Sequence, residues 1–167
     1  MRDMPRVRAI FESAFFESSL DAIEAAEVDR EFCRHGLSHL LDVARVAQLL
    51  NLERGLGLDR ELIYAAALLH DLGRAAQYET GEPHDEAGTR IAREILEGLP
   101  AELAFAEDEC AAIFAAVRGH RGAATGAGGA LTELICEADH RSRPCYACPV
   151  REDCYWPEER KNAAPYI

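Results

Sequence analysis

Apolar residues recur along this chain at helical spacing, and no stretch alternates in the way of a half-buried strand. The pattern predicts an all-α fold with loops at 74–83 and 119–129. Asp59 stands where the third helix needs an N-cap, and Gly36 is a candidate break in the second. The predicted helices cover about 6–27, 30–51, 62–69, 84–97, 101–118 and 130–141.

The length of 167 residues fits one domain, and 49% hydrophobic with 29% charged residues is typical of a globular chain. We expect a helix within 1–29 to pack on a helical domain at 30–143, followed by a short Cys-rich extension at 144–167. No apolar run reaches the roughly 18 residues of a membrane span, and the start lacks the apolar core of a signal peptide. The sequence therefore predicts a cytoplasmic protein with no membrane partner.

The net charge is −12, from 18 Lys and Arg against 30 Asp and Glu. A field of this sign repels nucleic acid, which is therefore not a favoured partner. An anionic small molecule would need a local positive site, and bound divalent metal or nearby arginines would supply one.

The strongest chemical signal is the pair His70–Asp71, which follows the apolar run AAALL. A lone histidine on an apolar face is usually a core residue, but a carboxylate buried without a partner costs several kcal/mol. A metal ion removes this objection, because it binds an ionised carboxylate and a neutral imidazole. Mixed His and Asp ligands favour a catalytic first-row metal over a structural zinc. Spacing alone leaves open whether His39, His120 and Asp139, on separate predicted helices, converge on this pair.

The strings HLLDVARVAQLL, YAAALLHDLGR and LICEADHRSR carry the order His, His-Asp, Asp. Over about residues 30–143 this order resembles the HD superfamily of metal-dependent phosphohydrolases. The resemblance implies one divalent metal, with Fe, Mn, Ni, Zn and Mg all open, held by His39, His70, Asp71 and Asp139. In dinuclear branches two more histidines lie between the HD pair and the last Asp. His84 and His120 occupy those places, which implies a second metal bridged by Asp71.

The same resemblance implies hydrolysis of a phosphate ester or anhydride of a small phosphorylated molecule, with a nucleotide favoured. Asp71 would bridge the metals and orient the nucleophile. Substrate phosphate would be gripped by Arg74, Arg121 or Arg143, although each could instead be a surface residue in a salt bridge. His35 could contact substrate or be structural, and His140 is expected to be structural. The Gly-rich segment lacks the features of a phosphate loop and is expected to be a connector or a lid.

Six cysteines occur in the chain, and Cys110 and Cys136 fall inside apolar helical patterns. The other four suggest a separate site, because residues 145–154 have the spacing C-x2-C-x5-C. Cys33 precedes His39 by six residues, and Cys145 follows Asp139 by six, so the two ends could approach each other. The arrangement resembles the iron–sulfur staple of certain nucleases, which favours a [4Fe–4S] cluster over zinc or no metal. The predicted ligands are Cys33, Cys145, Cys148 and Cys154.

Two other functions remain open. The histidine and aspartate order is also similar to the di-iron myo-inositol oxygenase-like branch, which would make the chain an oxygenase. The third reading is a non-catalytic metal or redox sensor.

Overall fold

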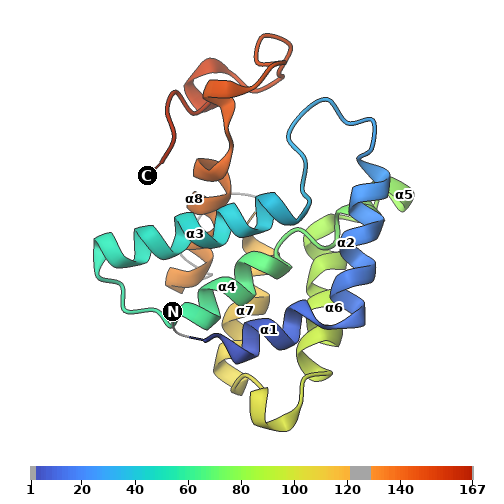
Figure 1. The fold of residues 1–167 in the computed structure, drawn as a ribbon, viewed down its shortest axis with the longest axis vertical. Coiled ribbons are helices and arrows are strands. Elements are labelled where there is room, and N and C mark those ends of the chain that lie inside the picture. Colours follow the sequence, from blue (N-terminus) through green and yellow to red (C-terminus); the bar gives the residue numbers. More distant parts are fainter. Residues whose placement is uncertain (1–2, 121–128, 167) are drawn as a thin grey trace.

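The computed structural model describes residues 3–120 and 129–166, and in this part of the chain the regular elements are all helical (Figure 1). The predicted all-α class is confirmed. None of the described helices is both long and apolar enough to cross a bilayer. The helices are α1 Pro5–Phe11, α2 Ala14–Ala26, α3 Leu37–Arg54, α4 Arg60–Leu69, α5 Arg74–Thr80, α6 His84–Glu97, α7 Glu107–Gly119 and α8 Gly129–Ser142, with 3-10 turns η1 Ala101–Leu103, η2 Cys145–Ala147 and η3 Glu158–Arg160.

Helix α4 is the centre of the bundle and contacts α1, α3, α6, α7 and α8. Its residues 65–69, Ala-Ala-Ala-Leu-Leu, are buried on every side. A helix that is apolar all round belongs in the interior, and its small alanines let neighbouring helices approach closely. The predicted cap is confirmed, because the Asp59 carboxylate accepts hydrogen bonds from the backbone N–H groups of Glu61 and Leu62. The end of α4 therefore delivers the next residues, His70 and Asp71, into the middle of the protein.

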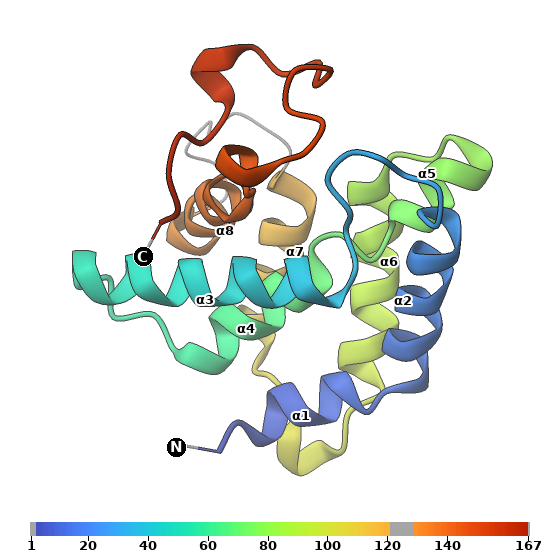
Figure 2. The ribbon, with the colours of Figure 1, turned by 45° about the horizontal axis from the view of Figure 1, so that its top comes forward.

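The other helices pack around this one (Figures 1 and 2). Helix α3 crosses α4 and also packs on α8, while α7 lies between α6 and α8. Helix α2 covers α5 and α6. The loop 27–36 and the C-terminal extension stand out on the same side of the bundle, and there the ring of Phe32 meets that of Tyr155 at 6.3 Å.

Several predicted boundaries were wrong. The first helix is two helices, since Ser13 is extended and separates α1 from α2. The second begins only at Leu37, after an extended Gly36. Residues 74–80 form α5 where a loop was predicted, and Gly81 ends it with φ of 80°. The stretch 101–118 is divided into η1 and α7, while the helices predicted at 84–97 and 130–141 are confirmed within about one residue.

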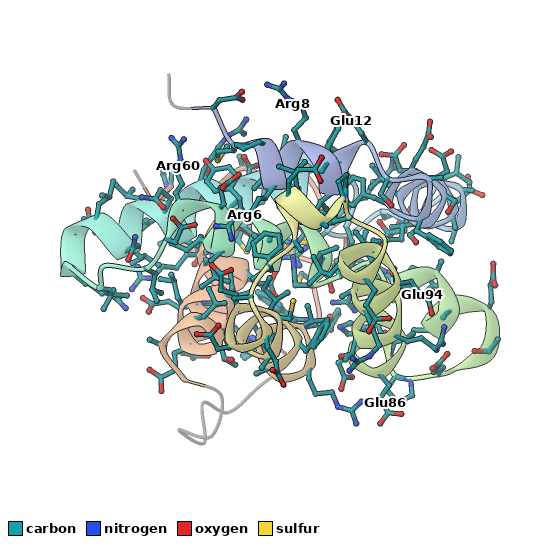
Figure 3. All side chains as sticks on the ribbon, turned by 90° about the horizontal axis from the view of Figure 1, so that it is seen from below. Arg6, Arg8, Glu12, Arg60, Glu86 and Glu94 are labelled. Atoms are coloured by element: carbon teal, nitrogen blue, oxygen red, sulfur yellow. The ribbon has the colours of Figure 1, made fainter. Side chains whose placement is uncertain are left out.

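Arg6 fastens α1 to the rest of the bundle. Its guanidinium donates to Glu61 at the start of α4 and to Glu109 at the start of α7, and its centre lies 4.3 Å from the Phe105 ring. Figure 3 shows Arg6 pointing inwards, whereas Arg8 on the same helix points to solvent. The Arg6 side chain is 19% exposed and that of Arg8 is 61% exposed. One cation thus joins three chain segments.

We expect Arg6→Met to lower the free energy of unfolding by about 2 kcal/mol, because it leaves two half-buried carboxylates without their cation. Arg8→Met, the matched control, should change it by less than about 0.5 kcal/mol. Urea unfolding of both variants checks this, and equal losses of stability in the two would contradict the role of Arg6 in joining the three segments.

Candidate metal centre

Six side chains from five helices or helix ends converge in the middle of the bundle. They form two groups whose ligand atoms lie within 4.8 Å of one another. Asp71 belongs to both groups, and its two oxygens divide between them. The first group is His39, His70, Asp71 and Asp139, and the second is Asp71, His84 and His120.

The distances show how Asp71 is shared. Its Oδ2 lies 3.5 Å from His39 Nε2 and 3.2 Å from His70 Nε2. Its Oδ1 lies 3.4 Å from the Nε2 atoms of both His84 and His120. One carboxylate therefore faces two pairs of imidazoles, one through each oxygen.

The elements that supply these side chains explain the convergence. His39 lies on α3, the HD pair directly follows α4, His84 begins α6, His120 ends α7 and Asp139 lies on α8. The pair His70–Asp71 is fully buried, and His84 and His120 are at most 3% exposed. The bundle thus encloses most of the group, as expected when a site is built between helices, and leaves Asp139 partly exposed.

Three of the four imidazoles are oriented by an acceptor at Nδ1. His70 lies 2.7 Å from the Ala67 carbonyl oxygen, and His120 lies 2.7 Å from that of Val117. His84 Nδ1 lies 2.7 Å from Gln77 Oε1. With Nδ1–H donating in each case, the lone pair of Nε2 points to the centre, which is the tautomer that a metal requires.

The ligand atoms of the two groups, among the described residues, are arranged unfavourably for one another and favourably for a metal ion. His39 Nε2, His70 Nε2 and Asp71 Oδ2 are buried and have no hydrogen-bond partner. The Nε2 atoms of His84 and His120 are 3.0 Å apart, although in these tautomers both are acceptors. Facing lone pairs repel unless a cation lies between them, so the donor set suits one ion in each group.

Both carboxylates of the centre are held ionised. Burial by itself raises the pKa of Asp71, but the close imidazoles of His70, His120 and His39 outweigh it and hold this pKa well below its usual range. Burial likewise raises the pKa of Asp139, and the charge of Arg143 overcomes it and lowers the pKa well below its usual range. Arg143 Nη2 donates to Asp139 Oδ1 at 2.7 Å, and Arg74 Nε donates to Asp71 Oδ1 at 2.8 Å.

A family model for the HD domain matches residues 36–160. The chain belongs to the HD domain family. At the level of the family, membership supports a metal-dependent phosphohydrolase. An HD superfamily hydrolase from an uncultured Thermotogales bacterium has the same fold, with a TM-score of 0.61 and 23% identity over 87% of this chain and 80% of that one.

Three relatives extend the comparison. An uncharacterized protein of Clostridium beijerinckii is 38% identical over 98% of this chain and 99% of its own length. Ribonuclease Y of Aquifex aeolicus is 40% identical over 37% of this chain, which is 11% of that enzyme. A deoxyguanosinetriphosphate triphosphohydrolase-like protein of Jannaschia sp. is 39% identical over 46% of this chain and 19% of its own length. The matched part thus spans about a tenth to a fifth of the last two relatives.

Close backbone contact sets the HD pair against α6. A Cβ built on Gly73 would lie 2.1 Å from the carbonyl oxygen of His84 and 2.4 Å from the nitrogen of Gly88. Only glycine allows this approach, and it brings the turn after the HD pair onto the helix that carries His84. Gly73 therefore positions ligands of the second group.

A cluster that the sequence did not reveal lies beside the HD centre. The carboxylate of Glu27 accepts hydrogen bonds from the backbone N–H and ring Nδ1 of His35 and from the Tyr78 hydroxyl. The His35 ring stands edge-on to that of His39, 5.8 Å away. Burial raises the pKa of Glu27, but the bonds from His35 and Tyr78 bring it to about 2. Glu27, Tyr78 and Gln77 gave no sequence signal, because Glu27 stands just after the end of α2 and the other two lie on α5, which was predicted as a loop.

A cavity of about 1430 Å³ connects these features. Its walls include His39, Asp139 and the predicted substrate contacts His35, Arg74 and Arg143. Arg121 and most of the Gly-rich segment lie outside the described residues. His140 meets the structural expectation, since its Nε2 donates to the Arg160 carbonyl and its ring packs 5.6 Å from that of Trp156.

Gly73→Ala should cost about 3 kcal/mol of stability and weaken metal binding, because the methyl group would push α6 away from the HD pair. Gly55→Ala is the control, with φ of 60° and no atom within 4 Å of the new methyl group. It should cost roughly 1 kcal/mol from backbone strain alone. Urea unfolding and metal titration check both, and full metal affinity in Gly73→Ala would contradict the positioning role.

The pH dependence of stability should show that the buried imidazole of His35 is held neutral in the folded protein. Burial lowers its pKa to about 4 from 6.5, despite the bond to Glu27 that raises it. The unfolded chain therefore takes up this proton first, and stability is lost as pH falls from about 6.5 to about 4. His35→Asn keeps a nitrogen donor for Glu27 but does not titrate.

The stability advantage of the wild type over His35→Asn should shrink by on the order of 2 kcal/mol across that window, as measured by urea unfolding with a chelator present. Parallel pH profiles for the two proteins would show that this histidine is not held neutral.

Proposed function

We propose that this HD protein hydrolyses a phosphate ester or anhydride of a small phosphorylated molecule, with a nucleotide favoured, using a two-metal centre. The observation that carries the proposal is the division of Asp71, whose two oxygens face two groups of ligand atoms. The proposed ligands are His39, His70, Asp71 and Asp139 for one ion and Asp71, His84 and His120 for the other.

Divalent metals, when bound, would lower the pKa of water and neutralise charge that develops on the phosphoryl oxygens. The protein contributes the placement of the ligands. Arg74 holds Asp71 through Oδ1, and Arg143 holds Asp139. Both carboxylates are therefore kept ionised and fixed in position before any ion arrives.

The cavity beside the centre suits an anion. Seven of the chain's 18 basic residues line it, against seven of the 30 acidic ones, so its lining carries no net formal charge although the net charge of the chain is −12. Among the described residues, Arg74 donates only through Nε, and its two terminal nitrogens meet no carboxylate. These two nitrogens form the fork that binds phosphate oxygens in pairs. Arg74 is thus the favoured phosphate contact.

His35 is proposed to contact the substrate as a neutral imidazole. Its Nδ1 proton is engaged by Glu27, and Nε2 is then the acceptor atom of a ring that lines the cavity. A neutral ring accepts a hydrogen bond from a hydroxyl group without repelling the metals. Glu27 and Tyr78 would keep this tautomer in place.

The named relatives support phosphoester or anhydride cleavage, because one is a ribonuclease and another a nucleoside triphosphate hydrolase-like protein. Between these chemistries the net charge of −12 favours a small molecule over RNA. The short matches leave the identity of the substrate to experiment.

The test is phosphate release from a panel of nucleotides and sugar phosphates after loading with Mn, Fe, Co or Mg. Asp71→Asn should lower kcat/KM by at least about 10³-fold, because it weakens both metal groups. His39→Ala and His84→Ala should each remove metal from one group and bring the metal content towards one ion per chain. Asp21→Asn, an exposed aspartate on α2, should behave as the wild type.

Metal-loaded protein that releases no phosphate from any substrate would contradict this function. Dioxygen consumption with an organic substrate would replace it with the oxygenase, and absence of any turnover would favour a sensor. Equal metal content in all variants would refute the ligand set.

A further inference from the structure

Three of the four predicted cysteine ligands lie on consecutive turns of the C-terminal extension. The N–H of Cys148 donates to the Cys145 carbonyl, that of Arg151 to Cys148, and that of Cys154 to Arg151. Arg151 also donates from its side chain to the Cys145 carbonyl, and Lys161 donates to the carbonyl of Arg151. The segment is therefore fixed by its own backbone and two cations.

The fourth thiol arrives from the loop 27–36, more than a hundred residues earlier. Helical spacing from His39 and Asp139 had suggested the approach, but neither Cys33 nor Cys145 continues the helix of its neighbouring ligand. Instead Phe32 packs edge-on against Tyr155 at 6.3 Å, which sets the residues beside Cys33 and Cys154 against each other. Burial is the main cause that raises the pKa of Cys33, Arg143 opposes it, and the three thiols of the extension raise it further. All four line the same cavity and are free cysteines.

The extension has almost no core of its own. In the described residues 144–166, Cys145 is the one that is fully buried. A segment of this size cannot hold an irregular fold by apolar burial, and such segments are usually held by disulfides or metal. The cysteines at the junction to the loop 27–36 are free thiols and form no disulfide. Metal ligation is therefore the interaction that would stabilise this segment.

We propose that Cys33, Cys145, Cys148 and Cys154 bind an iron–sulfur cluster of the [4Fe–4S] type that joins the extension to the loop before α3. This site is independent of the proposed hydrolase function. A single zinc ion with Zn–S bonds of about 2.3 Å would bring its sulfur atoms to roughly 3.8 Å from one another. The two groups of ligand atoms within 4.8 Å in residues 3–120 and 129–166 both belong to the HD centre, and neither contains a cysteine. The described thiols therefore do not have the spacing of a single zinc site, and a cubane, whose four irons hold its ligands farther apart, is the metal group that suits them.

The buried guanidinium of Arg143 complements this assignment. It bonds Asp139 on one side and lines the same cavity as Cys33. A four-thiolate cluster carries net negative charge, and a fixed buried cation beside it offsets that charge. The thiols of Cys110 and Cys136, which stand outside the set, serve as matched controls.

The experiment is anaerobic purification of the full chain, followed by analysis of iron, acid-labile sulfide and zinc. We expect about four sulfides per chain, with a visible charge-transfer band, since sulfide is not a component of the HD centre. The sulfide content should fall at least about tenfold in each serine variant of Cys33, Cys145, Cys148 and Cys154. It should stay at the wild-type level in Cys110→Ser and Cys136→Ser. Circular dichroism of each variant reports whether α3 and α8 remain folded.

Wild-type protein that contains zinc or no metal at the thiols, without sulfide, would overturn the proposal even if every variant unfolds. Full sulfide in Cys33→Ser would also overturn the assignment of the fourth ligand. Phosphate release measured on the same preparations tests the HD centre separately, so failure of one proposal is distinguishable from failure of the other.

Discussion

The burial of one ionised carboxylate at the end of the central helix is the constraint on which the rest of this structure depends. Asp71 has no exposure to solvent, and its negative charge would be very unfavourable there without compensation. Four imidazoles and the guanidinium of Arg74 surround it. The helices that carry these groups must therefore meet around α4, and the position of α4 in turn determines how the bundle is assembled.

Close packing and chemistry are linked in this arrangement. Alanines on α4 and the contact of Gly73 with α6 let the helices approach until their side chains can share a small ion. Acceptor atoms that face one another at the centre repel each other unless a cation lies between them. Folding and ion binding are expected to be thermodynamically coupled, because folding brings the ligand atoms together and a bound ion removes the repulsion between them.

The apolar periodicity predicted the helical class, whereas the convergence of six candidate ligands followed only from the resemblance to the HD superfamily, because spacing alone left it open. The sequence could not predict the partners of those ligands. Gln77 lies on α5, a helix taken for a loop, and Glu27 reaches His35 only because the chain between them turns back on itself. The break at Ser13 was also missed, since the apolar spacing continues across it. Arg74 and Arg143 were predicted as candidate phosphate contacts, but their hydrogen bonds to Asp71 and Asp139 depend on side-chain directions that spacing does not specify.

The end of α8 is held by a residue from the C-terminal extension. The side-chain amide of Asn162 donates to the carbonyl oxygens of His140 and Arg141 in the last turn of α8 and to that of Arg143 just beyond it. Asp139 lies within this same final turn. A proteolytic cut within the extension would therefore fray the end of α8 and loosen the carboxylate of Asp139. The extension thus influences the candidate metal centre without contributing a ligand to it.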